Sequence, residues 1–164
     1  MSGNRPLLSV VLPLFCLVLT FCAGAAATTT QSPLASSRAT TLTADERAIV
    51  RAINVVRLRS GRRPLRVGPA LTRAARSHSA DMARRGYFEH GAFVQRLRSF
   101  GVRAPYIGEN LASGTEPLTA AAIVQMWMTS PGHRGILLDR GFRLVGVGTA
   151  GGTMKLVTAD FAGR

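Results

Sequence analysis

Two short stretches decide the fold: GENLA at residues 108–112 and WMTSPGHR at residues 127–134. The first mixes small, polar and apolar residues, and we expect a strand there, or an ordered loop that runs into one. The second contains the end of a helix that is predicted to begin near Pro117 and to present a wide apolar face. The helix is expected to end there because a Pro-Gly pair interrupts it. After this break, residues 136–138 should form no more than one helical turn. A well-buried helix is therefore expected to follow the strand-like segment.

Three further helices are predicted toward the N-terminus. The first begins with a capping box, TADE at residues 43–46, and carries apolar residues on one face until Gly61. The second opens at Pro69, where the first turn of a helix tolerates proline, and ends at Gly86. A short third helix covers residues 93–100.

The C-terminal part is predicted to be extended. Residues 142–149 and 154–161 flank the turn AGGT at residues 150–153, which is a glycine-containing hairpin signal. Helices and a hairpin together predict a mixed domain with a small antiparallel sheet.

The N-terminus has the pattern of a secretory signal peptide. Arg5 is its only charge, residues 7–21 are apolar, and the small residues at 23–27 offer cleavage after Ala25 or Ala27. The mature chain is then expected to begin near Ala26 or Thr28. The alternative is an uncleaved anchor, although Pro13 shortens the apolar run.

The chain is therefore divided into a signal peptide at residues 1–27, a flexible linker at 28–42 and one domain at 43–164. The linker is rich in Thr, Ser, Ala and Pro and has no apolar period. Cys16 and Cys22 both lie in the signal segment, so the domain is cysteine-free and must be held by its core alone. A lipid-anchored Cys22 is the less favoured alternative.

The charge is strongly basic, with 21 Lys and Arg against 8 Asp and Glu. One basic residue and no acidic residue lies in residues 1–27, so the rest of the chain carries +12 of the net +13. This balance favours anionic partners such as an envelope polymer or lipid headgroups. Nucleic acid is not expected, because no aromatic residues are interleaved with the arginines to stack bases. The alternative is that the arginines only form solvated helix faces.

Three residues could share a site. His90, Glu109 and His133 stand at the ends of predicted elements, and two His with one Glu is a ligand set of catalytic zinc sites. Their spacing leaves open whether the fold brings them together. His78 instead lies on an apolar helical face and is predicted to pack in the core. No G-x-S-x-G motif frames a serine, so a serine hydrolase is not expected.

These motifs resemble a known family. GENLA and WMTSPGHR, together with HSADMA at residues 78–83, GYFEH at 86–90 and VGVG at 145–148, are similar to bacterial members of the CAP superfamily. This superfamily takes in cysteine-rich secretory, antigen 5 and pathogenesis-related 1 proteins, including SCP-like extracellular domains. The resemblance covers essentially residues 42–161. It implies a three-layer α-β-α sandwich, in which helices cover both faces of a small antiparallel sheet.

The resemblance also implies a cleft with two histidines and two glutamates, which in some members binds a divalent metal such as zinc. His90, Glu109 and His133 match three of these positions, and Ser130 stands where many animal and plant members have the second glutamate. The implied cleft therefore comprises His90, Glu109, His133 and Ser130, with a weaker or water-completed metal site at His90, Glu109 and His133. The loop after His90 is also shorter than in many bacterial members.

Two functions are compatible with these residues. The first is a secreted, non-catalytic extracellular binding module, associated with the cell envelope through an anionic polymer or lipid. The second is a metal-assisted, protease-like hydrolase that uses the same cleft, with Glu109 or a bound water as base. The first is preferred, because no nucleophile is framed and the fourth cleft position is a serine. No stable membrane span is expected once the signal is cleaved.

Overall fold

The computed structural model describes residues 40–115 and 117–164. The predicted signal peptide and all of the predicted linker except residues 40–42 lie outside the described residues. The described part contains nine elements in chain order: α1 (Ala44–Arg59), β1 (Arg66–Val67), α2 (Pro69–Arg85), α3 (Phe93–Ser99), β2 (Tyr106–Thr115), α4 (Ala120–Thr129), α5 (Pro131–Leu138), β3 (Phe142–Ala150) and β4 (Met154–Gly163).

The four strands form one sheet in the order β1-β3-β4-β2. The hairpin strands β3 and β4 pair antiparallel, and β2 pairs antiparallel with β4 along its whole length. Strand β1 pairs parallel with β3 over two residues, so the sheet is mixed rather than wholly antiparallel. The sequence prediction missed β1, because a two-residue strand is too short to show a period of two. Strand β2 lies at one edge of the sheet.

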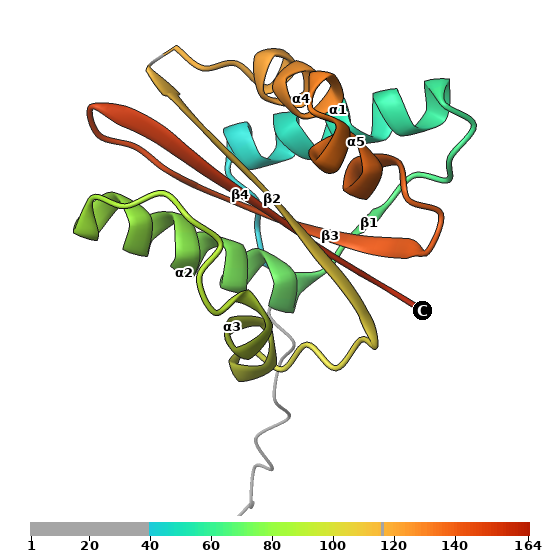
Figure 1. The fold of residues 1–164 in the computed structure, drawn as a ribbon, viewed down its shortest axis with the longest axis horizontal. Coiled ribbons are helices and arrows are strands. Elements are labelled where there is room, and N and C mark those ends of the chain that lie inside the picture. Colours follow the sequence, from blue (N-terminus) through green and yellow to red (C-terminus); the bar gives the residue numbers. More distant parts are fainter. Residues whose placement is uncertain (1–39, 116) are drawn as a thin grey trace, which may run out of the picture. The chain divides into compact units, whose positions relative to one another are not determined.

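Helices cover both faces of this sheet, as the resemblance implied. In Figure 1, α2 and α3 lie on one side of the strands, and α1, α4 and α5 lie on the other. Residues alternate accordingly along β4: Val157, Ala159 and Phe161 join the core beneath α1 and α4, whereas Ala162 packs with α2 and α3. The predicted three-layer α-β-α sandwich is confirmed.

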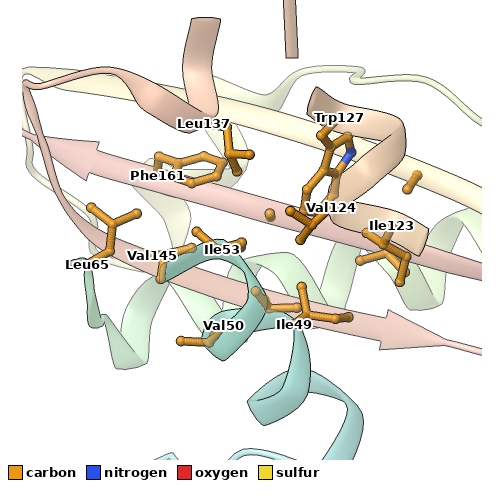
Figure 2. Packing of buried hydrophobic residues seen from close by; sticks show 14 of the residues in the cluster. Ile49, Val50, Ile53, Leu65, Ile123, Val124, Trp127, Leu137, Val145 and Phe161 are labelled. Atoms are coloured by element: carbon orange, nitrogen blue, oxygen red, sulfur yellow. The ribbon is translucent and has the colours of Figure 1, made fainter. Parts of the chain in front are cut away.

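The larger core layer joins α1, α4 and α5 to the sheet. Figure 2 shows the α1 side chains Ile49 and Ile53 and the α4 side chain Trp127 gathered over the strand residues Val145 and Phe161. All five are at most 1% exposed. The Trp127 indole Nε1 also donates a hydrogen bond of 2.7 Å to the carbonyl of Leu111. The helix that precedes the Pro-Gly pair is therefore fixed to the edge strand by packing and by one buried hydrogen bond.

Local signals set most helix ends. The predicted capping box is present at α1, where Thr43 accepts from the Glu46 amide and the Glu46 carboxylate accepts from the Thr43 amide. Gly86 ends α2 in the left-handed conformation with φ 70°, which glycine adopts without strain.

Two predictions around the fourth helix were wrong. Helix α4 begins at Ala120 and not near Pro117, because Thr119 is the N-cap and accepts a hydrogen bond from the Ala122 amide. The Pro-Gly pair itself begins α5, an eight-residue helix, where only a single turn over residues 136–138 was predicted. Pro131 occupies the first turn of α5, where its missing amide hydrogen breaks no helical bond.

Helix α2 lies unusually close to β3. A Cβ atom added at Gly146 would stand 2.2 Å from the backbone carbon of Leu71 and from the backbone nitrogen of Thr72. A Cβ at Gly148 would stand 2.2 Å from the backbone nitrogen of Arg76. Both obstacles are backbone atoms and cannot rotate away. The two glycines of the VGVG stretch therefore permit the contact between α2 and the sheet.

We predict that Gly146→Ala lowers the free energy of unfolding by at least about 2 kcal/mol, because the added methyl group forces α2 away from β3. Gly151→Ala is the matched control, since a Cβ there meets nothing within 4 Å. Urea unfolding monitored by circular dichroism measures both changes. Equal stability of the two variants would contradict the close-contact account.

Candidate functional site

The edge strand β2 carries the central residue of the site. Glu109 lies within β2 and pairs with Asp160 of β4, so both side chains are on the sheet face covered by α2 and α3. The expectation that Glu109 stands at the end of a short element was wrong, because β2 extends over ten residues. Glu109 is 3% exposed. A carboxylate buried to this degree needs charged or polar partners.

Two side chains supply these partners. His90, in the loop between α2 and α3, places its Nδ1 2.8 Å from Glu109 Oε1. Arg96 of α3 forms an ion pair with Glu109 Oε2. The Arg96 side chain is 13% exposed, whereas the His90 side chain is 52% exposed. Glu109 is therefore engaged through both oxygens, and His90 is held by its inner nitrogen with the outer edge of the ring open to solvent.

Asp160 completes the buried cluster. Its side chain is fully buried, and its Oδ1 lies 3.9 Å from Arg96 Nη2. Within residues 40–115 and 117–164, no donor reaches either carboxylate oxygen. A neutral carboxyl group can instead donate its own proton to Glu109, the residue opposite it in the sheet. Burial raises the pKa of Asp160 well above its usual value, and the negative charge of Glu109 raises it further, against the effect of Arg96.

Sequence reasoning did not single out Arg96 or Asp160. Asp160 left a signal, because it is a lone acid in the otherwise uncharged strand stretch 156–161. Arg96 left none, since it is one of many arginines. The position of Asp160 beside Glu109 follows from the strand register, and that of Arg96 follows from the packing of α3.

His133 lies at the start of α5. Its Nδ1 is 2.8 Å from the hydroxyl of Ser130, the N-cap residue. Its backbone carbonyl accepts a hydrogen bond of 3.0 Å from the side-chain Nδ2 of Asn110. Burial lowers the pKa of His133, and the positive charge of His90 lowers it further. No carboxylate in the described part of the chain bonds to His133, as a catalytic Ser-His pair would need.

A cleft of about 830 Å³ crosses the edge strand between α3 and α5. Its apolar lining comprises Phe93, Tyr106, Ile107, Ile136 and Phe142, and its polar lining includes His90, Glu109 and Asp139. Ser130 and His133 are not among the lining residues. The structure thus brings His90 and Glu109 together in the cleft and pairs Ser130 with His133 nearby. That all four share one cleft stays a prediction.

His78 belongs to α2 and does not line the cleft. It is 3% exposed, and its Nε2 is 3.0 Å from the carbonyl oxygen of Glu89. Burial lowers the pKa of His78, and the positive charge of Arg96 acts in the same direction. The prediction that His78 is a buried, hydrogen-bonded residue is confirmed.

The donor atoms limit how a metal could be held. The described residues contain no group of three His, Cys, Asp or Glu side chains arranged to hold a metal ion. Glu109 already uses both oxygens, whereas the hydrogen bonds at Nδ1 of His90 and His133 leave the Nε2 atoms for a ligand. The Nε2 atoms of His90 and His133 are therefore the imidazole atoms left for a ligand, and Glu109 orients His90 through its Nδ1.

A small sheet covered by helices on both faces is also the fold of a solved SCP-domain structure that is similar to this chain. The model of the cysteine-rich secretory protein family, CAP, matches residues 50–160. The chain therefore belongs to this family, and the match includes GENLA, WMTSPGHR and all the site residues.

Relatives and solved structures agree with this assignment. The uncharacterized protein YkwD of Bacillus subtilis (strain 168) is 33% identical over 129 residues, which are 76% of this chain and 49% of that protein. An extracellular SCP-domain protein of Bacillus anthracis strain Ames is similar in structure, with a TM-score of 0.67, 28% identity and coverage of 77% of this chain and 45% of that one. An outer surface protein of Borrelia burgdorferi has the same fold, with a TM-score of 0.67, 20% identity and coverage of 73% and 92%.

The chain spans about half the length of YkwD. It is also 32% identical over 127 residues to the uncharacterized membrane protein YlbC of the same organism, and this match covers 35% of YlbC. Among the described residues, no helix is both long enough and apolar enough to cross a membrane. Family membership establishes the fold, whereas activity must be argued from the site.

We predict a pH-dependent effect of Asp160→Asn. Because the folded-state pKa of Asp160 is raised above the usual value of about 3.9, the folded protein binds more protons than the unfolded chain. The stabilisation from this residue is fully present below about pH 4 and is lost as the pH rises through the raised pKa. The neutral asparagine does not undergo this loss.

Urea unfolding of both proteins over a pH series measures the difference. The free energy of unfolding of Asp160→Asn, relative to wild type, should increase from about pH 4 upward and level off above the folded pKa. A difference that is independent of pH would show that Asp160 is not held neutral by its surroundings.

Proposed function

We propose that this protein is exported and acts outside the cytoplasm as a non-catalytic binding module, whose cleft at the β2 edge takes a small amphipathic ligand. The observation that carries this proposal is the composition of the cleft. Five apolar or aromatic side chains line it, and His90 and Glu109 stand together at its polar part. Ligand sites of about 300–1,000 Å³ typically combine an apolar wall with a few fixed polar groups.

The burial and the hydrogen-bond partners of the Glu109 carboxylate favour a binding function over hydrolysis. A general base must lie within hydrogen-bond reach of the proton that it removes. Both oxygens of Glu109 are engaged, by His90 and by Arg96, and the side chain is 1% exposed. The metal-assisted hydrolase is therefore the weaker proposal, since it would need this network to open.

Export and an anionic partner are supported by separate observations. The predicted signal peptide is one, and the description of a 28% identical structural relative as an extracellular protein is another. The net charge of +12 outside residues 1–27 would draw such a domain to an anionic envelope polymer or lipid surface.

A divalent metal such as zinc is proposed to bind at Nε2 of His90 and His133. Neutral imidazole is a common zinc ligand, and a carboxylate that accepts from the other ring nitrogen fixes the tautomer of the ligand. Glu109 supplies that carboxylate for His90. When bound, the metal would offer open positions to an anionic or carbonyl group of the ligand.

Filling the cleft tests the binding function. A Cβ at Gly135 of α5, which lines the cleft, meets nothing within 4 Å, so Gly135→Phe should occupy the cleft without disturbing the fold. We expect saturable binding of the uncharged fluorescent probe Nile red to wild type, and at least a fivefold weaker affinity for Gly135→Phe, on the order of 1 kcal/mol.

Gly151→Phe is the control for this experiment, because Gly151 lies in the hairpin turn, outside the cleft, and is equally unobstructed. It should bind the probe as wild type does. The binding proposal fails if wild type shows no saturable binding, or if both variants bind equally well.

Calorimetric titration with zinc tests the metal proposal. His90→Ala and His133→Ala should each weaken zinc binding at least tenfold, and Glu109→Gln should weaken it by about tenfold through lost orientation of His90. Glu89→Gln is the control, because this exposed neighbour of His90 carries the same chemical change. Unchanged titrations in both histidine variants would exclude the two-imidazole site.

A further inference from the structure

A second hollow is lined almost wholly by arginine. It has a volume of about 220 Å³ and forms where the end of α1 meets the segment between α5 and β3. It shares no lining residue with the cleft. Its walls are Gly61 and five arginines: Arg57, Arg62, Arg63, Arg140 and Arg143.

Arg57 is the buried member of the residues that line this hollow. It is 1% exposed, although it carries a full charge. Its Nη1 donates to the carbonyls of Leu137 and Asp139 at 2.7 and 3.1 Å, and its Nε donates to the carbonyl of Arg63 at 2.9 Å. These acceptors are neutral, and the bonds do not use Nη2. Among the described residues, the guanidinium is therefore fixed in place by neutral acceptors and forms no ion pair.

Two of the neighbouring arginines also bond to carbonyl oxygens. Arg62 donates to the carbonyl of Leu138 at 2.9 Å, and Arg143 donates to the carbonyl of Phe142 at 2.9 Å. Across the described ranges, none of the five arginines forms an ion pair. The nearby carboxylate of Asp139 is occupied, because it accepts from the Gly141 amide at 2.6 Å and from the Tyr106 hydroxyl at 2.8 Å.

The electrostatics agree with this geometry. Burial lowers the pKa of Arg57, the negative charge of Asp139 raises it, and the positive charges of Arg143 and Arg62 lower it again. Five like charges around one small hollow repel one another. An anion between them would remove this repulsion and accept charge-assisted hydrogen bonds from the guanidinium groups.

The arginine hollow continues into a larger one. The neighbouring hollow, of about 690 Å³, shares Arg63 and Arg143 with it and adds Arg66 and Arg164. All four of these side chains are exposed. A ligand seated on Arg57 could therefore place a second anionic group against further arginines.

We propose that the arginine hollow binds an oxyanion of the phosphate class, and that the ligand it fits carries several such groups, as a chain of linked phosphates does. Guanidinium groups match the oxygen geometry of phosphate, and the two adjoining hollows extend the site along a chain. This proposal rests on the anionic partner in the proposed function and is independent of the cleft.

The test is calorimetric titration of the purified protein with inorganic polyphosphate and, separately, with inorganic phosphate, at constant ionic strength. The variant R63Q/R140Q removes two hollow charges whose side chains make no hydrogen bond within the described residues. R47Q/R51Q is the charge-matched control on the exposed surface of α1. Thermal unfolding confirms that both variants are folded.

Wild type is expected to bind polyphosphate at least tenfold more tightly than phosphate. R63Q/R140Q should weaken polyphosphate binding at least tenfold, and R47Q/R51Q less than threefold. Equal losses in the two variants would overturn the site while leaving a general attraction to anions. No binding of polyphosphate to wild type would remove both the site and the anionic partner. Equal affinity for phosphate and polyphosphate would overturn the linked-chain ligand.

Discussion

The buried negative charge of Glu109 constrains the structure around the site. A carboxylate with a side chain only 1% exposed is tolerated only if positive and polar groups surround it. Arg96 supplies the charge, His90 supplies a hydrogen bond, and Asp160 lies opposite in the sheet. The position of α3 and the orientation of the exposed imidazole are both tied to this one carboxylate.

The two stretches that decide the fold meet at the same strand. The Asn110 side chain donates a hydrogen bond to the carbonyl of His133, and the Trp127 indole donates one to the carbonyl of Leu111. Glu109 faces α3, whereas Asn110, the next residue along β2, faces the opposite side of the sheet. The edge strand therefore holds helices on both of its faces at once, and the cleft opens between them. A small sheet can in this way position side chains from distant parts of the chain.

Much of this arrangement is local and could be predicted. Thr43 and Glu46 predict the start of the first helix, Gly86 predicts the end of the second, and the glycines at residues 151–152 predict the hairpin turn. The pairing of Glu109 with Asp160 could not be predicted, because it depends on the register between two strands about fifty residues apart. The choice of Arg96 among twenty arginines depends on how α3 packs, which no short motif records. The fold was therefore more accessible from sequence than the chemistry of its site.

The central claim is that Glu109 orients His90 instead of acting as a free base. Nitrogen-15 NMR of the histidine rings tests it directly, recorded at about pH 9, well above the ordinary histidine pKa of about 6.5. The account predicts that His90 carries its proton on Nδ1, with Nε2 unprotonated, and that Glu109→Gln weakens this preference. A His90 ring protonated mainly on Nε2, or a tautomer unaffected by Glu109→Gln, would contradict it.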